Sequence, residues 1–178
     1  MTLEMSNIEI FEEVLNEAFK PADQSNLTEE NRDSKGRKFK ISFPIVKSSK
    51  TRCCLYRYDP NKKDIFPYFS SISGLKKICD YILFAEEGDY LFIFLIELKK
   101  GTESAKKQLN ASQEFVNYII NSAQRIGKAI DDKIAIRQIR VCDKNISRRK
   151  QNEDDNFKYV NNYCDYPYDN FYVEPMMQ

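Results

Sequence analysis

Apolar residues near the start of the chain recur every three or four positions, the spacing of one face of an α-helix. Within residues 6–19 these positions are Ile8, Phe11, Leu15 and Ala18. Ser6 precedes the pattern and Glu9 follows three residues later, which is the arrangement of an N-terminal capping box. The pattern predicts a helix over residues 6–19, and Pro21 ends it.

A longer helix is predicted after Gly101, where the same spacing returns. It begins at Thr102 or Ser104 and runs to about Ile126. Its apolar positions are Ala105, Leu109, Phe115, Val116, Ile119, Ile120 and Ala123. Nearer the N-terminus, residues 22–38 are rich in Asn, Asp, Glu, Lys and Ser, and we expect a mobile loop there.

Strands are expected in four places. Residues 39–46, 52–58 and 133–142 carry the β-branched and aromatic residues typical of strands. Residues 79–99 form a hairpin, in which two apolar segments flank Gly88 and Asp89. Because glycine tolerates the positive φ at the first central position of a type II′ turn, the sequence predicts a two-residue turn.

The second half of this hairpin is apolar from Leu91 to Ile96, directly before Glu97. Such a run indicates a central strand that is covered on both faces. The order helix, strands, hairpin, helix, strand predicts an α/β fold with a mixed central β-sheet flanked by helices. We expect one domain over residues 1–146 and a polar, tyrosine-rich C-terminal appendage over residues 147–178.

Composition excludes several classes of function. The 178 residues include no histidine, which removes Ser-His-Asp and Cys-His nucleophiles and histidine-bound zinc. The five cysteines form no Cys-x-x-Cys pair, so a structural zinc site is not expected. An odd number of cysteines without a signal peptide is typical of a reducing compartment. No apolar run approaches the ~20 residues of a membrane span, so we expect a cytoplasmic protein with no membrane contact.

Three charged residues gather at the base of the hairpin. A two-residue turn places Asp80 opposite Glu97, with Cβ atoms about 5 Å apart. Lys99 shares their face because strand side chains alternate. A four-residue loop would place Asp80 opposite Leu95 and leave the two carboxylates diagonal. In either register the carboxylates can share one cation.

Such a pair of carboxylates is unfavourable without a cation, because like charges on facing strands repel each other. Mg²⁺ or Mn²⁺ suits these oxygen ligands, together with waters and a substrate phosphate. The expected metal ligands are Asp80, Glu97 and the backbone carbonyl of Leu98. Lys99 would orient or deprotonate an attacking water. Glu-x-Lys is also the spacing of an ordinary strand salt bridge, but the apolar run and Asp80 favour a site.

These residues resemble a known motif. Asp80, the apolar strand and Glu97-Leu98-Lys99, followed by a helix, are similar to the motif of the PD-(D/E)xK nuclease superfamily, which includes many restriction endonucleases and junction resolvases. The resemblance covers about residues 7–143 and implies a restriction-endonuclease-like core of the order α-β-β-β-α-β. Cys79 departs from the pattern, since the family often has proline there.

The resemblance also implies roles for individual residues. Asp80 and Glu97 would bind the metal, and Lys99 would be the catalytic lysine. Many members carry an acidic residue on the first helix, for which Glu13 is favoured over Glu17. Gln108 is similar to a glutamine on the helix after the motif in several branches.

The expected function is therefore a metal-dependent nuclease that hydrolyses phosphodiester bonds, of DNA rather than RNA, in phage defence or DNA repair. The alternative is a catalytically silent module of the same fold that binds nucleic acid or a protein partner within a larger complex. A homodimer stays open, because many such nucleases cut two strands as dimers. A third interpretation is an unrelated α/β protein in which the motif arises by chance.

Two further sets of residues each have two interpretations. The whole-chain charge is +1, so nucleic-acid binding needs a local basic patch. Lysines near the motif either supply it or form a solvated helix surface: Lys99, Lys100, Lys106 and Lys107. Aromatic residues before the hairpin either stack on bases or pack in the core, and packing is favoured: Tyr56, Tyr58, Phe66, Tyr68 and Phe69.

Overall fold

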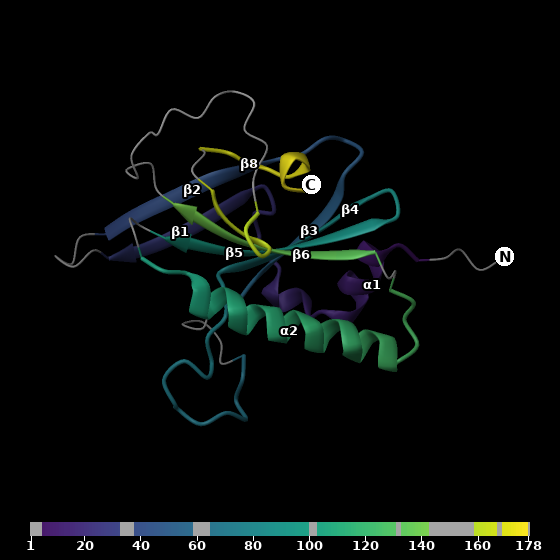
Figure 1. The fold of residues 1–178 in the computed structure, drawn as a ribbon, viewed down its shortest axis with the longest axis horizontal. Coiled ribbons are helices and arrows are strands. Elements are labelled where there is room, and N and C mark those ends of the chain that lie inside the picture. The colour runs from purple at the N-terminus through teal and green to yellow at the C-terminus, as the bar shows by residue number, and fades with distance from the viewer. Residues whose placement is uncertain are drawn as a thin grey trace.

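A five-stranded mixed sheet forms the centre of the structure, a computed structural model (Figure 1). The model describes residues 5–32, 38–58, 65–99, 103–130, 133–142, 159–166 and 169–177. In spatial order the strands are β3 (Arg52–Arg57), β4 (Tyr81–Glu87), β5 (Tyr90–Lys99), β6 (Ile134–Cys142) and β7 (Tyr163–Tyr166). The first three are antiparallel, whereas β6 and β7 run parallel to β5. The predicted α/β class with a mixed sheet is confirmed.

The hairpin of β4 and β5 has the register that a two-residue turn dictates. Glu87 pairs with Tyr90, and the pairing continues without interruption to Tyr81. Gly88 has a φ of +60°, whereas Asp89 is not among the described residues with positive φ. The turn is therefore of type II′. The two-residue prediction is confirmed, and the four-residue alternative is wrong.

The helices largely follow the predicted pattern. The helical elements are α1 (Asn7–Val14), the 3₁₀ helices η1 (Glu17–Phe19) and η2 (Glu174–Met177), and α2 (Lys106–Arg125). The capping box is confirmed: the Glu9 N–H donates to Ser6 Oγ at 3.3 Å, and the Ser6 N–H donates to Glu9 Oε2 at 2.8 Å. The first helix ends at Val14, so its predicted length is wrong. Asn16 interrupts it, because its side chain accepts the Ala18 N–H at 2.9 Å and starts η1.

The start of α2 also differs from the prediction. Ala105 is the N-cap residue and makes no side-chain cap. Ser104 Oγ accepts only a long hydrogen bond of 3.4 Å from the Lys106 N–H. Thr102, the other predicted cap, lies outside the described residues.

A second, three-stranded sheet packs against the face of the central sheet that is opposite to α1 and α2. Its strands are β1 (Asn26–Arg32), β2 (Lys38–Val46) and β8 (Phe171–Tyr172). The loop predicted over residues 22–38 is wrong for residues 26–32, because β1 pairs along its whole length with β2, and residues 33–37 lie outside the described residues. β1 is an edge strand, and among its described side chains, those of residues 26–30, Leu27 alone is fully buried, so it lacks the apolar alternation that identifies strands in sequence.

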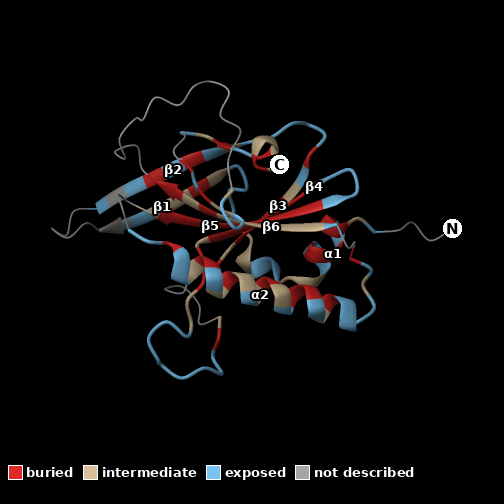
Figure 2. Ribbon diagram, in the orientation of Figure 1, coloured by how far each residue is buried: buried red, intermediate tan, exposed pale blue. Residues whose placement is uncertain are grey.

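The central sheet therefore separates two hydrophobic cores (Figures 1 and 2). On one face it packs against α1 and α2, through residues such as Phe11, Phe84 and Val116. On the other face it packs against β1, β2 and the C-terminal segment, through residues such as Leu27 and Phe94. Both helices lie on one face of the central sheet, and the second sheet covers the opposite face.

The described C-terminal residues belong to the packed domain. β7 extends the central sheet beside β6, and β8 pairs with β2. The fully buried side chains in this segment are Tyr166, Phe171, Val173 and Met176. The appendage expected over residues 147–178 does not match these residues, because their side chains lie in the core between the two sheets. No helix in the described part of the chain is long and apolar enough to cross a membrane.

Candidate functional site

One edge of the central sheet collects the residues predicted to carry the chemistry. β3 and β5 end at this edge, β4 begins there, and the parallel strand β6 ends there. α2 begins at the same edge (Figure 1). Asp80 immediately precedes β4, while Glu97 and Lys99 lie at the end of β5. The two-residue turn therefore brings residues from both strands of the hairpin together.

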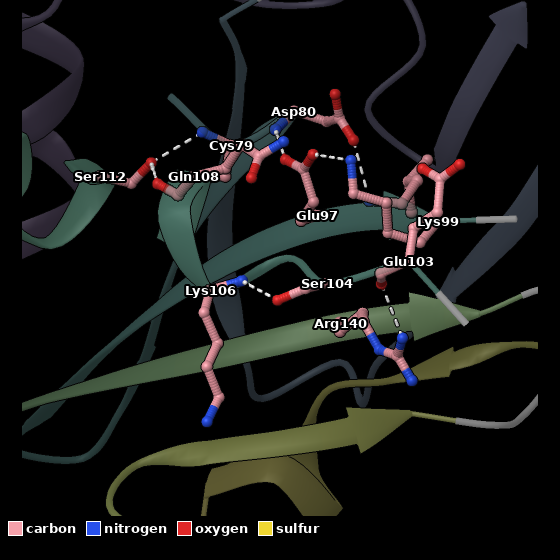
Figure 3. A network of polar contacts seen from close by, with 11 residues as sticks. Cys79, Asp80, Glu97, Lys99, Glu103, Ser104, Lys106, Gln108, Ser112 and Arg140 are labelled. Atoms are coloured by element: carbon pink, nitrogen blue, oxygen red, sulfur yellow. Dashed lines mark hydrogen bonds and ion pairs between the residues drawn. The ribbon is translucent and has the colours of Figure 1, made fainter. Parts of the chain in front are cut away.

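Asp80 and Glu97 hold each other in place by reciprocal hydrogen bonds (Figure 3). The Asp80 N–H donates to Glu97 Oε2 at 3.1 Å, and the Leu98 N–H donates to Asp80 Oδ2 at 2.8 Å. Lys99 Nζ forms an ion pair with Glu97 Oε1 at 2.7 Å. The structure thus brings together the three side chains that the sequence singles out.

The environment of the pair disfavours two negative charges. Glu97 is only 4% exposed. Burial, followed by repulsion from Glu97, raises the pKa of Asp80 to about 8, against the lowering effect of the Leu98 N–H. Burial also raises the pKa of Glu97, although the ion pair with Lys99 opposes this. For Lys99, burial lowers the pKa, but the hydrogen bond and charge of Glu97 and the charge of Asp80 outweigh it, so the pKa is raised and the ammonium stays charged.

A third carboxylate, not predicted from the sequence, acts on the pair. The charge of Glu29 raises the pKa of both Asp80 and Glu97. Glu29 lies on β1, two residues after the buried Leu27 and therefore on the same face of the strand. Because β1 lacks an apolar pattern, its pairing with β2 and the position of Glu29 near the hairpin emerge only from the tertiary structure.

The backbone of Leu98 also faces the carboxylates. In an antiparallel ladder the N–H and C=O of one residue point to the same neighbouring strand. Since the Leu98 N–H donates to Asp80, its carbonyl lies on that side too. The Cys79 N–H, which would bond this carbonyl if the ladder continued, donates instead to Ser112 Oγ at 2.7 Å. The carbonyl predicted as a third ligand thus lies on the same side of β5 as Asp80 and is not bonded by the Cys79 N–H.

Gln108 is brought to the same edge by α2. It lies in the first turn of the helix, and its side chain extends toward Glu97 (Figure 3). Ser112, one turn later and fully buried, donates to the Gln108 carbonyl at 2.9 Å. Because Ser112 also accepts the Cys79 N–H, it ties this helical turn to the residue before Asp80.

Glu13 lies elsewhere. Its carboxylate forms an ion pair with Lys128 Nζ at 2.5 Å. Lys128 follows the C-terminal end of α2, and a helix of 20 residues is about 30 Å long. Glu13 is therefore near the opposite end of α2 from Gln108, and the structure does not bring it to the carboxylate pair.

The side chains alone do not complete a metal centre. Within the described residues, no group of three or more His, Cys, Asp or Glu side chains is arranged to hold a metal ion. A cation bound at Asp80 and Glu97 would need backbone carbonyl, water or substrate oxygens as further ligands. This is the usual coordination of Mg²⁺, which retains several waters and binds one or two carboxylates.

Arg140 organises the neighbouring strands. It pairs with Glu97 across β5 and β6, but its guanidinium turns away from the carboxylates. Nε donates to Asp165 Oδ1 and Nη1 donates to the Glu103 carbonyl, both at 2.7 Å. Arg140 thus anchors the segment that leads into α2 and does not form an exposed basic patch. Residues 148–150, a basic run, lie outside the described part of the chain.

A pocket opens beside this edge, on the side of β1. Its volume is about 340 Å³. The residues that line it include Lys20, Thr28, Arg57 and Tyr81. Tyr81 directly follows Asp80, and its hydroxyl donates to the Thr28 carbonyl at 2.7 Å. The lining thus includes two cationic side chains and the carboxylate of Asp23, but neither Asp80 nor Glu97.

Comparison with known proteins found no matching family model, no matching curated protein and no matching solved structure.

Proposed function

We propose that this protein is a metal-dependent nuclease that hydrolyses phosphodiester bonds, with DNA as the favoured substrate. The observation that carries the proposal is the arrangement of Asp80, Glu97 and Lys99. Two carboxylates share one buried edge at which their ionisation is disfavoured, and a charged lysine contacts one of them. Clustered groups with shifted pKa values are typical of catalytic sites.

The donor set fits a hard divalent cation. All the candidate ligands are oxygens, from Asp80, Glu97 and the Leu98 carbonyl, and binding a cation would offset the repulsion in the pair. A bound Mg²⁺ or Mn²⁺ would stabilise the charge on a pentacovalent phosphate and acidify an attacking water. The PD-(D/E)xK resemblance of this segment, with the chain order α1, β3, β4, β5, α2 and β6, supports the same conclusion.

The remaining residues have roles that follow from their positions. Lys99 is charged and held by Glu97, so it is placed to orient a water or offset charge on the phosphate. Gln108 points toward Glu97 from α2 and can hydrogen-bond a water or a phosphate oxygen. The burial of Glu97 excludes bulk water from one side of the pair and so strengthens these interactions.

A second candidate function is a nuclease-fold module that binds nucleic acid or a protein partner without cutting. One observation favours it: the carboxylates of Asp80 and Glu97 already accept hydrogen bonds from the chain itself. Titration with Mn²⁺ followed by calorimetry separates the two functions. The nuclease binds Mn²⁺ through a site that Asp80→Asn abolishes, whereas the module shows no such site.

Cleavage assays test the proposal directly. The purified protein is incubated with single- and double-stranded DNA in Mg²⁺, in Mn²⁺ and in EDTA. We expect Asp80→Asn and Glu97→Gln to lower the cleavage rate more than about 100-fold, since both changes remove a charged ligand. Asp89→Asn is the matched control, because Asp89 lies at the exposed tip of the same hairpin. If both site variants cut DNA as fast as the wild type, the proposal is wrong.

A further inference from the structure

The segment between β3 and the hairpin carries an unusual group of exposed apolar side chains. Residues 65–78, here termed the aromatic loop, contain Tyr68 at 72% exposure, Phe69 at 38%, Ile72 at 67% and Leu75 at 40%. Figure 1 shows the loop projecting past α2, and Figure 2 shows most of it as exposed. Exposed apolar side chains gathered in one place mark an interaction site.

The loop is held at both ends. Phe66 is buried and packs edge to face against Phe115 of α2, with ring centroids 5.4 Å apart. At the other end Ile78 is buried, directly before Cys79 and Asp80. Turns within the loop are closed by backbone hydrogen bonds, such as that from the Phe69 N–H to the Phe66 carbonyl at 3.1 Å. The exposed rings of Tyr68 and Phe69 therefore lie on a segment whose two ends are fixed by packing.

The structure divides the five aromatic residues singled out in the sequence. Tyr56, Tyr58 and Phe66 are buried in the core between the central sheet and the helices, as the packing interpretation predicted. Tyr68 and Phe69 are exposed, and their rings lie 4.6 Å apart. Of these five, Tyr68 and Phe69 are the ones whose rings are open to a ligand.

The charge of the aromatic loop indicates which kind of ligand it binds. Residues 65–78 contain Lys76 and Lys77 and no acidic residue, in a chain with 27 Asp and Glu residues. Three serine hydroxyls, from Ser70, Ser71 and Ser73, add hydrogen-bond donors. Aromatic rings combined with cations and hydroxyls suit the bases and phosphates of a nucleic acid.

We propose that the aromatic loop binds unpaired bases, so that single-stranded nucleic acid, or a strand with an unpaired segment, is the substrate class. Tyr68 stacks on a base, and the lysines lie along the phosphate backbone that leads to Asp80. Bases within a duplex are already stacked on each other and offer no free face to Tyr68. The choice of substrate class rests on the proposed nuclease function, but the binding itself does not require cleavage.

The test is fluorescence anisotropy in EDTA with labelled single-stranded and duplex DNA of the same sequence. Tyr68→Ala removes the ring on which a base would stack, so we expect it to weaken single-strand binding by about 5- to 150-fold. Tyr68→Phe keeps the ring and should bind like the wild type. Tyr90→Ala is the matched control, because Tyr90 is 53% exposed at the opposite end of the sheet.

Four outcomes overturn the inference: no binding by the wild type, unchanged binding by Tyr68→Ala, an equal loss on duplex DNA, or an equal loss in Tyr90→Ala. The experiments distinguish a failure of the loop inference from a failure of the nuclease proposal. If the wild type binds single strands through Tyr68 but never cuts in Mg²⁺ or Mn²⁺, the loop inference stands and the nuclease proposal falls. If Asp80→Asn abolishes cleavage while Tyr68→Ala has no effect on binding, the nuclease proposal stands and the loop inference falls.

Discussion

The carboxylate pair predicts that Asp80→Asn makes the metal-free protein more stable. The folded protein raises the pKa of Asp80 from its ordinary value of 3.8 to about 8. Between these two values the unfolded chain has lost the proton that the folded protein keeps. Stability therefore falls as the pH rises through this window, and the full cost is present above about pH 8.

The size of the effect follows from the same two values. One unit of pKa corresponds to about 1.4 kcal/mol, so the rise from 3.8 to about 8 sets an upper limit of about 6 kcal/mol. Relaxation of the site and entry of water reduce this, and we expect a gain of about 2 kcal/mol for Asp80→Asn. Asparagine keeps an acceptor for the Leu98 N–H, so that hydrogen bond is not lost.

Thermal unfolding in EDTA, followed by circular dichroism at pH 5 and pH 8, measures the gain. For a chain of 178 residues, 2 kcal/mol corresponds to a rise in Tm of about 4–8 °C at pH 8, with less than half of that at pH 5. Asp89→Asn, the exposed control, should change Tm by less than about 2 °C. Mn²⁺ should then stabilise the wild type and not Asp80→Asn. An Asp80→Asn variant no more stable than the wild type at pH 8 would refute the reasoning.

Three further changes test other parts of the site. Ser112→Ala removes the acceptor of the buried Cys79 N–H and should lower the free energy of unfolding by about 1–3 kcal/mol in urea denaturation, whereas Ser112→Thr should retain most of it. Lys99→Met leaves the buried Glu97 carboxylate without its partner. It should lower the free energy of unfolding by about 3 kcal/mol at pH 8 and abolish cleavage. Unchanged stability would contradict the buried ion pair. Gly88→Ala should cost about 1 kcal/mol by thermal unfolding, from backbone strain alone, because nothing lies within 4 Å of the added Cβ; a gain in Tm would contradict the positive φ.

Local rules made the hairpin predictable. The turn length sets which residues face each other, and strand alternation sets which share a face. Asp80, Glu97 and Lys99 were therefore identifiable from a short stretch of sequence, and the structure brings them together. Gln108 was proposed from the resemblance alone, and its position at the same edge follows from the start of α2 there.

Other parts of the site depend on pairing between distant segments. Glu29 acts on the carboxylates because β1 pairs with β2, although the sequence of β1 is mostly polar and predicts a loop. The sequence correctly predicted that Glu13 lies on the first helix. Glu13, however, lies near the C-terminal end of α2, away from the carboxylate pair. Neither position follows from periodicity, because both depend on how two elements pack.

The sequence by itself determined the hairpin and which charged residues gather at its base, because these follow from backbone geometry over neighbouring residues, and the structure selected the two-residue register. Tertiary structure alone decided that β1 and the C-terminal strands complete the fold, and that Tyr68 and Phe69 are exposed while Tyr56, Tyr58 and Phe66 are buried. The physical reason is that polar edge strands and aromatic residues carry no periodic signal of their own. Their positions are set by the backbone hydrogen bonds and apolar surfaces that distant segments provide.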